Sequence, residues 1–155
     1  MCVAIALTFS ELPLTLIDAH ALADRVHERG GEREVRFYYR ARPALLPVWW
    51  CGRLHVLQWG NKDRRERKLP PTGWTWHDTL AEGRWRELAP EPVLIPVTYG
   101  YMGGVWFKIK EGLHGIVVRD RGGEPAVFAV CEPATRCYSV MTRCEWMPRL
   151  VGEVI

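Results

Sequence analysis

Hydrophobic and polar positions in the first fifth of the chain predict one strand and one helix. Residues 3–9 alternate loosely and are rich in β-forming side chains, which favours a strand. Apolar residues then recur near helical spacing, with Asp18 near the start and Gly30-Gly31 as a stop signal. These apolar residues are Ile17, Ala21, Leu22 and Val26. The spacing predicts a helix over residues 17–29.

The rest of the chain is typical of short β segments separated by turn residues. The expected strands cover residues 34–39, 44–50, 53–59, 93–97, 105–110, 115–119 and 126–131. A weaker helical pattern covers residues 77–88, where Leu80 and Trp85 would face the core. We therefore predict an α+β fold in a single domain over residues 1–155. Its curved mixed or antiparallel β-sheet closes toward a barrel, with two or three flanking helices.

Composition fits one water-soluble domain. Hydrophobic residues make up 48% and charged residues 25% of the chain, and no stretch approaches the roughly 20 apolar residues of a membrane span. The five cysteines are odd in number and form no C-x-x-C pair, which argues against a disulfide framework and a zinc site. We expect a cytoplasmic protein with no membrane partner, no metal and no cofactor.

Positive charge is concentrated in one segment. The formal net charge is +3, and residues 62–68 carry five basic and two acidic side chains, so this segment accounts for the whole excess. A solvated loop and a phosphate-contacting loop are both open interpretations. The basic candidates for contact with DNA are Arg40, Arg42, Lys62, Arg64, Arg65, Arg67 and Lys68.

Tryptophan is abundant, with eight residues spread over most of the chain. Each indole ring either packs in the core or offers a flat face on which an unpaired base can stack. Trp50, Trp74 and Trp76 flank the basic segment and are the first candidates for stacking.

Several short motifs occur in a characteristic order. They are Met1-Cys2, Tyr39-Arg40-Ala41-Arg42-Pro43, Leu57-Gln58-Trp59-Gly60, Leu94-Ile95-Pro96 with Tyr99-Gly100-Tyr101, and Met147-Pro148. Together they resemble the SOS-response-associated peptidase (SRAP) family, whose members act on abasic sites in single-stranded DNA. The resemblance spans nearly the whole chain and implies single-stranded DNA as the partner.

The resemblance also implies a specific reaction at Cys2. Once the initiator methionine is removed, an N-terminal cysteine carries an amine and a thiol on adjacent carbons. The amine attacks the aldehyde of a ring-opened abasic sugar, and closure by the thiol gives a stable thiazolidine. Cys2 is therefore the first catalytic candidate.

The chain departs from the family at three positions. The family's asparagine falls at Trp74, its glutamate at about Met102 or Gly103, and its histidine at Cys144. His77, Cys144 and Glu145 are candidates to replace these groups in part. Because the family positions converge on one pocket, we expect Cys2, Trp74, His77, Met102 and Cys144 to lie near one another.

Three functional hypotheses follow. The first is a protein that binds single-stranded or abasic DNA near Cys2, with little or no catalysis. The second is a degenerate relative that binds a protein or nucleic acid through the same fold. The third is a cysteine hydrolase that uses Cys2 or Cys144 with His77 as the base.

We predict that the chain is a poor abasic-site crosslinker even after Met1 is removed. General acid and base groups usually contribute about a hundred- to ten-thousandfold in rate, and the residues at the three family positions carry no amide, carboxylate or imidazole. Incubation with abasic single-stranded DNA followed by denaturing electrophoresis measures the adduct. Rapid, heat-stable crosslinking that disappears in Cys2→Ala would contradict the prediction.

Overall fold

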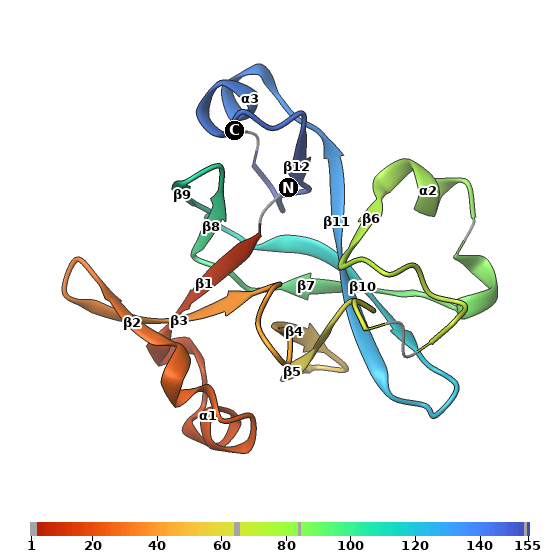
Figure 1. Ribbon diagram of the computed structural model, residues 1–155, viewed down its shortest axis with the longest axis horizontal. Helices are drawn as coiled ribbons and strands as arrows, with labels where there is room; N and C mark the ends of the chain where they lie inside the picture. The colour runs from red at the N-terminus through yellow and green to blue at the C-terminus, as the bar shows by residue number, and fades with distance from the viewer. Residues whose placement is uncertain (1–2, 64–65, 84, 154) are drawn as a thin grey trace.

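The computed structural model describes residues 3–63, 66–83, 85–153 and 155, and it confirms an α+β fold (Figure 1). The strands are β1 (Ala4–Thr8), β2 (Val26–Arg29), β3 (Glu32–Tyr38), β4 (Leu45–Trp50), β5 (Arg53–Trp59), β6 (Trp74–Trp76), β7 (Glu91–Ile95), β8 (Tyr99–Met102), β9 (Val105–Lys108), β10 (Leu113–Arg119), β11 (Pro125–Pro133) and β12 (Trp146–Pro148). The α-helices are α1 (Leu14–Ala19), α2 (His77–Ala81) and α3 (Arg136–Thr142), and the 3-10 turns are η1 (Phe9–Glu11), η2 (Leu22–Arg25) and η3 (Arg86–Leu88). In the described part of the chain, no helix has the length and apolar character needed to cross a membrane.

Five strands close into a barrel in the order β10-β7-β4-β5-β11. Closure comes from β10, which pairs with both β7 and β11. The barrel is mixed because β11 runs parallel to β5 while the other neighbouring pairs are antiparallel. This confirms the predicted sheet that closes on itself.

A second, antiparallel sheet has the order β2-β3-β1-β8-β9. Its central strand β1 places Ala4 between Tyr38 on one side and Tyr101 on the other. The same pattern reaches Val3, whose N–H donates to the Tyr101 carbonyl at 2.9 Å and whose carbonyl accepts from Tyr39 N–H at 3.0 Å. The start of the chain is therefore held between β3 and β8 from Val3 onward.

The two sheets share one main hydrophobic core. Its members include Ile5, Leu7, Val35 and Phe37 from the second sheet and Val48, Trp59, Ile95 and Val127 from the barrel. Trp59 is 1% exposed, and its Nε1 donates to the Gly73 carbonyl at 3.0 Å. Any side chain at Gly73 would place a Cβ 2.5 Å from that nitrogen, so glycine is required for this contact.

The predicted helix over residues 17–29 is wrong for most of its length. Helix α1 ends at Ala19, a 3-10 turn follows, and Val26–Arg29 forms strand β2. Ala21 adopts a left-handed conformation with φ 51°, which ends regular helix. Gly30 and Gly31, both with positive φ, then turn the chain into a hairpin in which β2 pairs with β3.

The helix expected over residues 77–88 is broken in two. Gly83, with φ 79°, follows the short helix α2 and precedes η3. Leu80 and Trp85 do pack toward a core, as predicted, in a smaller cluster with Phe128 and Val130 of β11. Helix α3 was not predicted, although the Thr135 hydroxyl caps it by accepting from Tyr138 N–H.

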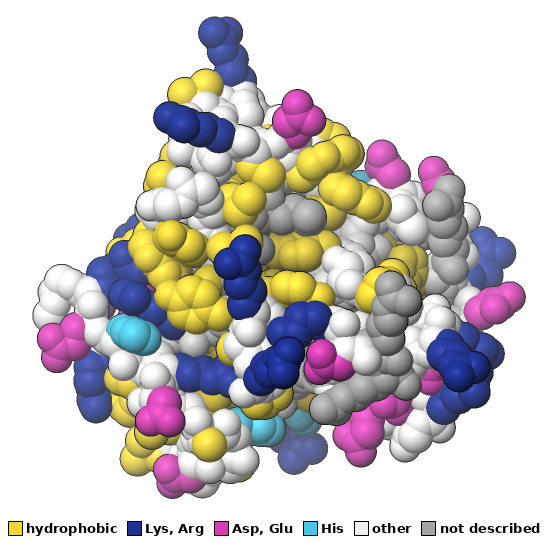
Figure 2. Space-filling view, viewed as in Figure 1, with side chains coloured by type: hydrophobic (Ala, Val, Ile, Leu, Met, Phe, Trp, Pro, Cys, Tyr) yellow, Lys and Arg dark blue, Asp and Glu magenta, His cyan; other side chains and the backbone are white. Residues whose placement is uncertain are grey.

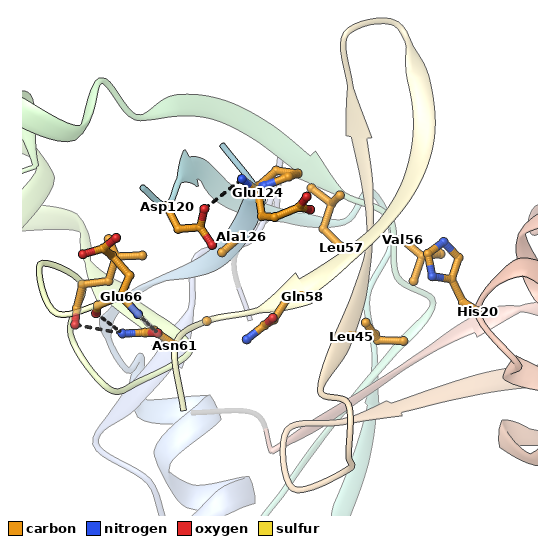
Figure 3. Close-up of a pocket in the computed structure, with 13 residues that line it drawn as sticks. His20, Leu45, Val56, Leu57, Gln58, Asn61, Glu66, Asp120, Glu124 and Ala126 are labelled. Carbon is orange, nitrogen blue, oxygen red and sulfur yellow. Dashed lines mark hydrogen bonds between the residues drawn. The ribbon is translucent and has the colours of Figure 1, made fainter. Parts of the chain in front are cut away.

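The basic segment is organised by two buried polar residues, Asn61 and Glu66 (Figure 3). Asn61 Nδ2 donates to the carbonyls of Glu66 and Leu69, and its Oδ1 accepts from Glu66 N–H. The Glu66 carboxylate accepts from the N–H groups of Lys68 and Arg121. These bonds lower the pKa of Glu66, against a smaller opposing effect of burial, and nearby positive charge adds to the lowering. These bonds tie Asn61 to the backbone of Glu66 and Leu69, and the Glu66 carboxylate to the backbone of Lys68 and Arg121.

We predict that Asn61→Ala lowers the free energy of unfolding by roughly 2 to 4 kcal/mol, because it leaves several buried backbone groups without partners. Urea unfolding should show a lower midpoint with an unchanged m-value. Asp63→Ala, at an exposed position in the same loop, is the matched control and should change stability little. Equal midpoints for the two variants would contradict this role for Asn61.

Candidate nucleic-acid interface

The candidate interface lies where β6 and β12 flank the C-terminal half of β11. In this register Cys131 of β11 is opposite both Trp76 of β6 and Pro148 of β12. Two residues further on, Pro133 is opposite Trp146. Directly paired residues project on the same side of a sheet. Trp76 and Trp146 therefore approach each other from opposite edges of β11.

Trp76 and Trp146 form an exposed aromatic pair. Their ring centroids are 3.8 Å apart with an interplanar angle of 56°, and each residue is 37% exposed. Most tryptophans of the chain lie deeper: Trp59, Trp74 and Trp85 are all less than a tenth exposed. Because α2 begins directly after Trp76, the end of β6 holds this indole at the rim. We call these two residues the tryptophan pair.

Cys144 and Glu145 lie in the short connection between α3 and β12. Arg143 ends the helix in a left-handed conformation, and the Ala134 N–H donates to the Glu145 carbonyl at 2.8 Å. The Cys144 thiol is half-buried against the main core. Burial raises its pKa, whereas hydrogen bonds from the backbone of Trp146 and Glu145 lower it. The Glu145 side chain is exposed.

A glycine contact brings the β8–β9 turn to this connection. Gly103 has φ 60°, and a Cβ at this position would lie 2.2 Å from the carbonyl oxygen of Thr142, the last residue of α3. Met102, just before it, packs on the main core together with Cys144. The turn therefore adjoins the segment that leads to Trp146.

Of the five positions expected to converge, three share one core cluster. Trp74 is a buried member of it, and Met102 and Cys144 pack against it. His77 begins α2, next to Trp76. Cys2 lies outside the described residues, so its place relative to the others stays a prediction.

His77 belongs to a group of charged side chains around His114. Burial lowers the pKa of His114, Arg149 and His77 lower it further, and Glu132 opposes them. The His114 N–H donates to the Arg149 carbonyl at 2.9 Å, which ties β10 to the end of β12.

In the described ranges, no cluster of three or more histidine, cysteine or acidic side chains is arranged to bind a metal ion.

The basic side chains that were predicted to contact DNA differ in exposure and in the hydrogen bonds that they make within the protein. Lys62 Nζ donates to the carbonyls of Tyr39 at 3.0 Å and Ala41 at 3.2 Å, so it stabilises the loop after β3. Arg40, Arg67 and Lys68 are exposed. Arg64 and Arg65 lie outside the described residues.

A pocket of about 530 Å³ lies beside Lys62, and its lining includes Arg42, Lys62, Asp63, Gln58 and Trp59. In Figure 2 hydrophobic side chains gather across the middle of the face, and Lys and Arg side chains lie directly below them. This arrangement sets positive charge beside exposed apolar surface, as a nucleic-acid groove requires.

Two stacking candidates lie in the core instead. Trp50 is 9% exposed, donates from Nε1 to Glu91, and is covered by the Arg119 guanidinium 5.0 Å from its ring centroid. Trp74 is 8% exposed and packs edge-on against Trp59. Neither ring offers an open face, which leaves Trp76 as the exposed member of the three. Trp146 was missed as a candidate because its partner is 70 residues away in the sequence.

A second pocket, of about 290 Å³, lies over β5 and the end of the β10–β11 hairpin (Figure 3). Its polar lining includes Glu66, Asp120 and Glu124, and Asp120 accepts from the Glu124 N–H at 2.9 Å. These three carboxylates make the pocket lining negatively charged, which opposes the binding of a phosphate.

Comparison with protein-family models, with curated proteins and with solved structures gives no match for this chain. The resemblance to the SRAP family therefore rests on the motifs quoted above.

We predict that binding of single-stranded DNA weakens steeply with salt and that Arg64→Ser, Arg65→Ser and Arg67→Ser together flatten this dependence. Each phosphate contact contributes about −0.7 to the slope of log K against log salt. Fluorescence anisotropy over a salt series measures the slope. An unchanged slope would assign the segment to a solvated loop.

Proposed function

We propose that this protein is an SRAP-like single-stranded-DNA-binding protein that stacks unpaired bases on the tryptophan pair and has little or no catalytic activity. The observation that carries the proposal is the ring contact between Trp76 and Trp146 at an exposed rim. Unpaired bases expose flat apolar faces, and stacking on an aromatic side chain contributes about 1 to 3 kcal/mol per base.

The surroundings of the pair support a nucleic acid as its partner. Arg143 is exposed in the connection that leads from α3 to Trp146. The chain has a formal net charge of +3 and a pI of about 8.7, which favours an anionic partner. Stacking does not depend on base identity, so we expect weak sequence preference.

Weak catalysis follows from the groups at the family positions. Trp74 is buried and Met102 is apolar. At Gly103 the Thr142 carbonyl leaves no space for any side chain, so the carboxylate that family members use does not fit there in this backbone. The Cys144 thiol is the one proton carrier among these residues.

We predict that Trp76→Ala and Trp146→Ala each weaken binding of oligo(dT) about 5- to 150-fold, since each removes one stacking surface worth about 1 to 3 kcal/mol. Anisotropy of a labelled oligonucleotide measures the affinity, and duplex DNA of the same length should bind less tightly.

Trp49→Ala is the matched control. Trp49 is 46% exposed and lies on β4, which pairs with β5 and β7 and not with β6 or β12. It should bind as the unmodified protein does. Unchanged affinity in both Trp76→Ala and Trp146→Ala, with folding verified by urea unfolding, would refute the proposal.

A further inference from the structure

The second sheet presents a face on which arginine and aromatic side chains surround a strand of small residues. On β1, Ala6 is opposite Arg36 of β3 and Tyr99 of β8. Ala4 is likewise opposite Tyr38 and Tyr101. The next strand, β9, adds Trp106 opposite Tyr101 and Lys108 opposite Tyr99. Since paired residues project together, these side chains share one face, which we call the arginine face.

Stacking orders the side chains of the arginine face. The Arg29 guanidinium carbon is 4.4 Å from the Tyr99 ring centroid and 4.5 Å from that of Trp106. Arg36 lies over Trp106 at 5.0 Å, and Tyr101 contacts the same indole with centroids 4.9 Å apart. Arginine stacked in this way loses less conformational freedom when it then binds a ligand.

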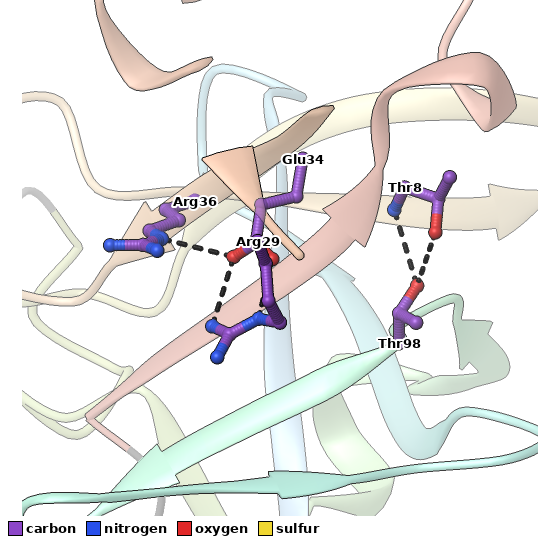
Figure 4. Close-up of polar contacts among 5 residues, drawn as sticks. All are labelled: Thr8, Arg29, Glu34, Arg36 and Thr98. Carbon is purple, nitrogen blue, oxygen red and sulfur yellow. Dashed lines mark hydrogen bonds and ion pairs between the residues drawn. The ribbon is translucent and has the colours of Figure 1, made fainter. Parts of the chain in front are cut away.

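Glu34 completes the arrangement (Figure 4). It is 4% exposed and accepts from Arg29 Nε at 2.6 Å, Arg29 Nη2 at 3.1 Å and Arg36 Nε at 2.9 Å. Burial raises the pKa of Glu34, but the bonds and charges of Arg29 and Arg36 outweigh this and lower it. Two guanidinium groups share the Glu34 carboxylate, so Arg29, Arg36 and Glu34 together carry a net charge of +1.

Arg36 keeps donors available at the surface. Its side chain is 20% exposed, and Nε is the one nitrogen for which a described residue acts as acceptor. Glu34 and Trp106 set the direction of the guanidinium group, and Nη1 and Nη2 have no acceptor among the described residues. An oriented guanidinium with free terminal donors matches the oxygens of a phosphate. Lys108, exposed on the same face, adds a further positive charge.

The arginine face is connected to the tryptophan pair through β8. This strand runs from Tyr99, on the arginine face, to Met102 and the turn at Gly103, which contacts Thr142 at the end of α3. Trp146 follows four residues after Thr142. Strand β8 thus leads from the arginine face to the segment that precedes Trp146.

We propose that the arginine face is a second contact surface for the same single-stranded DNA, with backbone phosphates bound by Arg36 and Lys108. The inference rests on the proposed function, because it extends the path of the strand that the tryptophan pair holds.

The test compares Arg36→Gln with Arg33→Gln on oligo(dT) of about 5 and about 15 nucleotides, lengths within the range of single-strand binding sites. Arg33→Gln is the matched control, because it removes the same charge from the same strand. Arg33 is opposite Glu28 in the β2–β3 register and lies over the Phe9 ring, away from Trp106. Arg36→Gln should weaken binding of the longer oligonucleotide about tenfold, as for one charge-assisted phosphate contact, and should flatten its salt slope by about 0.7.

Arg33→Gln should change affinity by less than about twofold, because this exposed charge lies away from the proposed phosphate contacts and is screened by salt. Because Arg36→Gln also removes a partner of Glu34, Lys108→Gln provides a second test that leaves this ion pair intact. It should also weaken binding of the longer oligonucleotide and spare the shorter one.

Two outcomes would overturn this inference and leave the proposed function standing, provided that the unmodified protein binds through Trp76 and Trp146. One is an equal loss of affinity in Arg36→Gln and Arg33→Gln. The other is an unchanged affinity for the longer oligonucleotide in both Arg36→Gln and Lys108→Gln. Absence of binding by the unmodified protein would overturn the proposed function and this inference together.

Discussion

Strand β11 hydrogen-bonds to four other strands, and the way it divides them between its two halves sets the position of the candidate interface. Its N-terminal half pairs with β10 and β5 and closes the barrel. Its C-terminal half extends past the barrel and pairs with β6 and β12. Neighbouring strands lie about 4.8 Å apart, so β6 and β12 are separated by about twice that distance, which two facing indole rings can bridge. The contact between Trp76 and Trp146 thus follows from the pairing of β6 and β12 with β11, and neither strand produces it alone.

The tryptophan pair and the arginine face both hold exposed side chains in defined positions. The protein buries Trp59, Trp74 and Trp85 almost completely, yet leaves Trp76 and Trp146 each 37% exposed. Water in contact with apolar rings is unfavourable, so a partner that covers them gains free energy. On the second sheet, Glu34 and Trp106 fix Arg36 without using its terminal donors. One surface suits the bases of a single strand and the other its phosphates.

Local patterns in the sequence predicted most barrel strands, since β5 and β10 are short runs rich in apolar residues with glycine-bearing turns beside them. They failed where tertiary pairing decides the structure. Val26 continues the helical spacing of the apolar residues before it, but it pairs with Val35, and residues 26–29 form a strand. Strands β6 and β12 have three residues each, too few for any period, and form because β11 offers free edges. The candidate Trp76 could be proposed from its place beside the basic segment. Trp146 could not, because its role depends on a contact across β11.

The segments in which the chain departs from the SRAP motifs make specific packing contacts in this structure. The three segments concerned, around Trp76, Gly103 and Cys144, meet at the same rim through the tryptophan pair and the contact of Gly103 with Thr142. That contact needs a residue with no side chain, so α3 and the β8–β9 turn approach each other at the expense of a carboxylate there. Two residues after Cys144, Trp146 contributes packing and exposed ring surface. Replacing proton-carrying groups by close packing and aromatic surface lowers the capacity for acid and base catalysis while it creates a surface for stacking. These features are the ones on which the proposed binding of single-stranded DNA with little catalysis depends.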